Sequence, residues 1–192
     1  EGGDLIYHDN YIFVGYYNKN DYSNLFTART NNKALEFLKD FFPNKTIRGF
    51  HLNKSLNNPL KNILHLDCCL QIVGNDKAII YPQAFTNEED YQWLVSFFGI
   101  INIFEISNNE MYEMTSNVLS INSNIVVSQP IFERLNTWLE SKDLIVEKVD
   151  LSNYTSKQKQ SLQKGYEIWC SGCLSGDWED EVFRNNNIGN SD

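Results

Sequence analysis

A histidine and an aspartate stand two residues apart in a strongly apolar stretch, "ILHLDCCLQIVG", as His65 and Asp67. We expect this stretch to form a buried strand, on which residues two apart point to the same side. Histidine can donate and accept a proton near neutral pH, and a carboxylate can hold a cation through hydrogen bonds. The pair is a candidate acid–base and cation-binding site. The competing interpretation is a strand end that only satisfies its own hydrogen bonds.

The cysteines fall into two pairs with different expected roles. Cys68 and Cys69 are adjacent in the apolar stretch, and we interpret them as small core residues. Cys170 and Cys173, in "GYEIWCSGCLSG", are candidates for a nucleophilic thiolate. A Cys-x-x-Cys pair can also be a redox or zinc site, but this sequence offers no second pair and no histidine close to it, so we expect no metal.

Composition narrows the class of protein. The 192 residues are 42% hydrophobic and 14% aromatic, which is typical of one folded domain with a sizeable core. A formal net charge of −9 argues against a nucleic-acid partner, which would require a basic face. No apolar run has the length of a membrane span, so we expect no membrane association. Four cysteines in a chain that can build its own core favour a reducing, cytoplasmic setting.

The apolar pattern predicts the order strand, strand, helix, strand three times, over residues 4–52, 64–106 and 117–149. Pro43 should end the first helix, Gly99 should end the second, and Pro130 should lie in the first turn of the third. A unit of this size cannot bury both faces of its own sheet. We therefore expect an α/β architecture in which the units pack around a common axis.

Three short motifs fall at corresponding strand ends of these units. They are "EGGD" at residues 1–4, "RTN" at 29–31 and "HLD" at 65–67, and a cysteine follows near the C-terminus. This ordered set resembles the guanidine-modifying enzymes, which include arginine deiminases, dimethylargininases and amidinotransferases. The resemblance covers roughly residues 1–151 and implies the pentein fold, an α/β propeller of ββαβ repeats.

The resemblance also implies limits for the domain. Pentein catalytic domains have five repeats, whereas three are recognisable here, so we expect the propeller to be incomplete at its N-terminus. We assign residues 1–170 to a partial catalytic domain and residues 171–192 to a polar, acidic tail.

Site residues follow from the same resemblance. Cys170 would be the nucleophile, His65 the acid and then the base, and Glu1 would orient the histidine or hold the guanidinium. The substrate-binding residues would be Asp67, Asp4 and Arg29, with the arginine on a substrate carboxylate. The implied partner is a small guanidino compound, and no cofactor is implied.

The activity that this set favours is hydrolysis of arginine or a substituted arginine through a covalent thiouronium intermediate. An amidinotransferase would share the first half of that reaction and differ only in the acceptor. A catalytically inactive, pentein-like binding protein is the third alternative.

Overall fold

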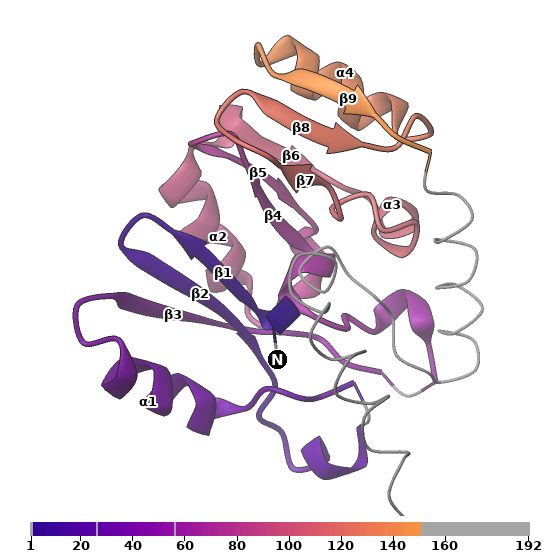
Figure 1. Ribbon diagram of the computed structural model, residues 1–192. Coiled ribbons are helices and arrows are strands. Elements are labelled where there is room, and N and C mark those ends of the chain that lie inside the picture. Colours follow the sequence, from indigo (N-terminus) through magenta and orange to yellow (C-terminus); the bar gives the residue numbers. More distant parts are fainter. Residues whose placement is uncertain (1, 26, 56, 151–192) are drawn as a thin grey trace, which may run out of the picture.

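The computed structural model describes residues 2–25, 27–55 and 57–150 as three ββαβ units (Figure 1). In each unit the first two strands pair antiparallel, and the second pairs in parallel with the strand that follows the helix. This confirms the predicted order. The units are β1 (Leu5–His8), β2 (Tyr11–Tyr16), α1 (Asn32–Phe41), β3 (Thr46–His51); β4 (Leu70–Val73), β5 (Lys77–Ile80), α2 (Glu88–Phe98), β6 (Ile103–Glu105); and β7 (Leu119–Ser120), β8 (Ile125–Ser128), α4 (Glu133–Ser141), β9 (Ile145–Lys148).

One hydrophobic core extends across the units. Helix α2 lies between the first and second sheets (Figure 1) and packs its aromatic side chains on the first. The ring centroids of Trp93 and Phe97 lie 5.8 and 5.7 Å from that of Phe13 in β2. Trp138 of α4 likewise lies 5.3 Å from Phe104 of the second sheet. Each such ring pair contributes about 0.5–1.5 kcal/mol beyond the free energy gained from burying apolar surface. The stability of a sheet therefore depends on the helix of the next unit.

Helix α1 confirms the predicted helix, and it leaves two large apolar side chains exposed. Leu35 lies against the strand β3, where a Cβ added to Gly49 would come within 2.9 Å of its side chain. Phe37 and Phe41 stack on one another at 5.5 Å, yet they are 62% and 64% exposed. Asn31 begins the helix by accepting a hydrogen bond from the Lys33 amide.

Two boundaries differ from the prediction. The strand expected over "ILHLDCCLQIVG" begins only at Leu70, because residues 66–68 form a 3-10 turn, η4 (Leu66–Cys68). The third helix begins at Glu133, so Pro130 lies in the turn before it and not in its first turn. Gly99 does end α2, with a φ of 77° that favours glycine. Within the described ranges, no helix is long and apolar enough to cross a membrane.

Candidate functional site

Asp4 joins the three motifs that the sequence singles out. Its carboxylate is buried, and Oδ2 accepts a hydrogen bond from the Thr30 hydroxyl at 2.7 Å. Oδ1 accepts one from the backbone amide of Leu66 at 3.1 Å. A carboxylate held away from water needs donors of this kind. The "EGGD", "RTN" and "HLD" segments therefore meet at one buried carboxylate, although up to 62 positions separate them in the sequence.

Gly15 in β2 lets these segments approach the first sheet. A Cβ at this position would lie 2.8 Å from three atoms, Asp4 Oδ1, Leu52 Cδ1 and Leu66 Cβ. A Cβ atom essentially never comes within 3.0 Å of an atom to which it is not bonded in a folded protein. The packing around Asp4 therefore requires glycine at position 15.

His65 and Asp67 do not share a strand face, which corrects the sequence-based geometry. His65 precedes η4 with an extended backbone, and Asp67 lies inside the turn. The turn is closed by the Cys68 and Cys69 amides, which donate to the carbonyls of His65 and Leu66. Both side chains of the His-x-Asp pair are nevertheless buried, at 0% and 3% exposure. The prediction of a buried polar pair stands, while the strand geometry from which it was argued does not.

The surroundings of Asp67 fix its position. The Cys68 thiol donates to its Oδ1 with a sulfur–oxygen distance of 3.7 Å. The hydroxyl of Ser116, from the segment before β7, donates to its backbone carbonyl at 3.2 Å. Asp67 is therefore held from two sides, by the residue that follows it and by the third unit.

Cys68 and Cys69 are free, buried thiols. Burial raises the pKa of both well above the usual value, and the charge of Asp67 raises each further. The Cys69 thiol donates to the Leu66 carbonyl at 3.2 Å. A raised pKa leaves these groups as thiols at neutral pH, so they are core residues, as their position in the sequence predicted.

Arg29 is half-buried and precedes Thr30, so the tie between Thr30 and Asp4 places it close to the His65 segment. A residue that sequence reasoning missed lies beside it. The Lys54 ammonium donates to the carbonyls of Thr27 and Leu64 at 2.7 and 2.6 Å. Lys54 stands in an asparagine-rich loop, "NKSLNN", which is typical of a solvated turn, and no local pattern marks it.

Two of the predicted catalytic residues, Glu1 and Cys170, lie outside the described residues, as does Cys173. The predicted boundary between the domain and the acidic tail, between residues 170 and 171, also lies outside the described residues. The described part of the candidate site therefore consists of Asp4, Arg29, His65 and Asp67 with their partners.

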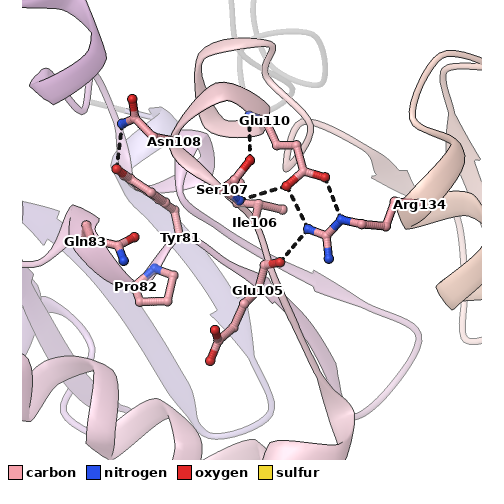
Figure 2. A pocket seen from close by; sticks show the side chains of 9 residues that line it. All are labelled: Tyr81, Pro82, Gln83, Glu105, Ile106, Ser107, Asn108, Glu110 and Arg134. Carbon is pink, nitrogen blue, oxygen red and sulfur yellow. Dashed lines mark hydrogen bonds and ion pairs between the residues drawn. The ribbon is translucent and has the colours of Figure 1, made fainter.

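An open pocket of about 790 Å³ lies elsewhere, between the second and third units (Figure 2). Figure 2 shows Arg134 of α4 directed at Glu110 of the short helix α3 (Asn108–Tyr112), with Nη2 to Oε2 at 2.7 Å. Hydrogen bonding to Arg134 is the main cause that lowers the pKa of Glu110 to about 2, and hydrogen bonds to Ser107 add to it. None of the motif residues that the structure describes lines this pocket. Within the described ranges, no group of three or more His, Cys, Asp or Glu side chains could hold a metal ion.

Comparison with known proteins agrees with the motifs. The family model for eukaryotic N,N dimethylarginine dimethylhydrolase matches residues 17–142. An uncharacterised protein of Bacillus subtilis, YkgA, is 28% identical over 152 residues, which are 79% of this chain and 46% of the relative. The chain thus spans about half the length of the curated relative that it matches.

Solved structures show the same fold at lower identity. One is the N-terminal domain of ArgZ, an arginine dihydrolase from cyanobacteria, solved with its product. It superposes with a TM-score of 0.66 at 15% sequence identity, and the match covers 90% of this chain and 53% of the ArgZ chain. The dimethylarginine dimethylhydrolase of Pseudomonas aeruginosa was solved as a cysteine-to-serine variant with citrulline. It superposes with a TM-score of 0.57 at 19% sequence identity, and the match covers 79% of this chain and 49% of that enzyme. The fold is the pentein fold, and the chain belongs to the N,N dimethylarginine dimethylhydrolase family within the guanidine-modifying superfamily.

Proposed function

We propose that this chain contributes the site of a cysteine-dependent hydrolase that acts on the guanidinium group of arginine or a substituted arginine. One observation carries the proposal. The carboxylate of Asp4 holds the segment of Arg29 against the segment of His65 through Thr30 and Leu66. Family membership supports the reaction class, and the structural neighbours solved with L-arginine or citrulline support the substrate class.

The proposed reaction has two halves. The Cys170 thiolate adds to the guanidinium carbon, and the carbon–nitrogen bond to the leaving amine breaks as His65 donates a proton to that amine. A covalent thiouronium remains on the sulfur. His65 then takes a proton from water, whose oxygen adds to the same carbon. The carbon–sulfur bond then breaks and the remaining hydroxyl proton passes to solvent, which restores the thiolate and releases a neutral ureido product.

Acidic side chains and one arginine would hold the substrate. Asp67 would accept hydrogen bonds from the guanidinium, Glu1 would orient His65, and Arg29 would hold a carboxylate at the other end of the substrate. The sequence groups Asp4 with the substrate-binding acids. Because both of its oxygens accept hydrogen bonds from the protein, we assign it instead to holding the Arg29 and His65 segments together.

Labelling by 2-chloroacetamidine tests the proposal. This amidine alkylates an activated thiolate in a guanidinium pocket, and the adduct is located by peptide mass spectrometry. We expect one adduct, on Cys170, that excess L-arginine suppresses. Cys170→Ser should abolish it and the matched variant Cys173→Ser should retain it. Labelling that arginine does not suppress, or an adduct on Cys173 instead, would contradict the assignment.

Two further variants test the assigned roles. His65→Gln should lower the rate of ureido product formation by roughly 10²–10⁴-fold, because it removes the proton donor and acceptor. Arg29→Ala should raise KM for a substrate with a carboxylate by the equivalent of about 2–4 kcal/mol and leave kcat nearly unchanged. An unchanged KM would remove Arg29 from the substrate site. Formation of a new guanidino compound when a primary amine is added would identify a transferase instead.

A further inference from the structure

Lys54 bridges two segments that carry proposed site residues. Its ammonium donates to the carbonyl of Thr27, two residues before Arg29, at 2.7 Å. It also donates to the carbonyl of Leu64, the residue before His65, at 2.6 Å. Both distances are short for a nitrogen–oxygen hydrogen bond, as expected where the donor is charged.

Asp4 bridges the same two segments on the other side of the site residues. It accepts from Thr30, the residue after Arg29, and from Leu66, the residue after His65. Arg29 and His65 therefore each lie between a residue tied to a cation and a residue tied to an anion. The charges suit the groups that they contact, because the ammonium can only donate and meets two carbonyls, while the carboxylate can only accept and meets two donors.

Charged groups close to Lys54 act on its ammonium group. Burial lowers the pKa of Lys54, the negative charge of Asp4 opposes that change, and the positive charge of Arg29 adds to it. Two cationic side chains close together also raise the local positive potential, which favours an incoming carboxylate.

We propose that Lys54 is a positioning residue that sets Arg29 relative to His65, and so gives the site its preference for guanidino compounds that carry a carboxylate. This inference rests on the proposed function, because it takes Arg29 as the carboxylate contact. Lys54 itself need not touch the substrate. Its effect is on the distance between the two ends of the substrate site, where misplacement by about 1 Å can change rates or affinities by up to about a hundredfold.

A pair of ligands that differ only in the carboxylate tests this. L-arginine carries it and agmatine lacks it, and each is titrated as a protectant against 2-chloroacetamidine, which also lacks a carboxylate. In Lys54→Met we expect the affinity for L-arginine to fall about tenfold or more relative to that for agmatine. Lys61→Met is the matched control, since Lys61 is an exposed lysine in the 3-10 turn that follows this loop, η3 (Pro59–Lys61), and it should leave the ratio unchanged.

A purely structural role would lower protection by both ligands together, so an unchanged ratio in Lys54→Met overturns the proposal. If Lys54→Met does not fold, Thr30→Val serves as the second variant. It removes the hydroxyl that Asp4 binds, preserves the side-chain volume, and should change the ratio in the same direction.

Failure of the proposed function is distinguishable. If the unmodified chain is not protected by L-arginine, hydrogen exchange replaces ligand titration as the readout. Lys54→Met should then speed amide exchange in residues 27–30 and 64–66 together, while Lys61→Met should not. Unchanged exchange in these two segments would overturn the bridging role whatever the activity.

Discussion

Replacing Gly15 by alanine is a direct test of the packing around Asp4. The new methyl group would lie 2.8 Å from Asp4 Oδ1, Leu52 Cδ1 and Leu66 Cβ, where ordinary contacts are 3.4–4 Å. Each neighbour would have to move by more than half an ångström. Overpacking of this kind costs about 1–3 kcal/mol. We place the effect in the upper half of that range, since one of the displaced atoms accepts the hydrogen bond from the Leu66 amide.

The assay is urea unfolding followed by tryptophan fluorescence, with a thermal melt in parallel. For a chain of this size, a loss of 2–3 kcal/mol lowers Tm by roughly 4–12 °C. Gly2→Ala is the control, because a Cβ at Gly2 meets nothing within 4 Å. Protection by L-arginine should weaken in Gly15→Ala only. If Gly15→Ala and Gly2→Ala unfold at the same urea concentration, the close approach of the three segments is refuted.

Two further predictions concern the surroundings of the candidate site, and a third concerns the separate pocket of Glu110 and Arg134. Burial raises the pKa of the Cys68 and Cys69 thiols, so iodoacetamide should leave both unmodified in the native chain, and rapid alkylation of either would contradict their assignment to the core. Ser116→Ala removes the donor to a buried carbonyl and should lower the free energy of unfolding by about 1 kcal/mol, whereas no change would exclude that hydrogen bond. Hydrogen bonds from Arg134, and after it from Ser107, lower the pKa of Glu110 to about 2. The stabilisation by the Arg134–Glu110 pair, about 1 kcal/mol because the pair is partly exposed, is complete above pH 4.5 and is lost as pH falls towards 2. Glu110→Gln should therefore be less stable than the unmodified chain at pH 7 and equal to it near pH 2, and a constant difference would refute the pairing.

The repeat could be predicted from the sequence because each unit encodes its own order of periodicities. Alternating apolar residues in the strands and the i, i+3, i+4 pattern in the helices are local signals. The strand predicted over residues 64–69 does not form there, and the cause is a long-range contact. Leu66 is apolar and buried, as in a strand, but its amide donates to Asp4, 62 positions away, and so the chain turns before β4 begins. Local pattern carries no information about that contact.

The candidate site likewise combines residues that local motifs mark with contacts that only the fold creates. The motifs identified His65, Asp67 and Arg29 as candidate site residues from their residue types. In the structure the segments that carry them are connected by hydrogen bonds to Asp4. The sequence held no sign that Lys54 is tied to both segments, because an asparagine-rich loop predicts a solvated lysine. It grouped Asp4 with the substrate-binding acids, and the motif alone does not indicate that both carboxylate oxygens of Asp4 accept hydrogen bonds from the protein.

The packing of α2 on the first sheet has a consequence for the chain as it is synthesised. The apolar face that carries Phe13 and Phe50 is covered by a helix that ends roughly fifty residues after β3. At about 5–20 residues per second, this face stays open on the ribosome for several seconds. Nascent chains arrested after β3 should therefore remain sensitive to protease in the first unit. Chains long enough to free α2 from the exit tunnel should become resistant.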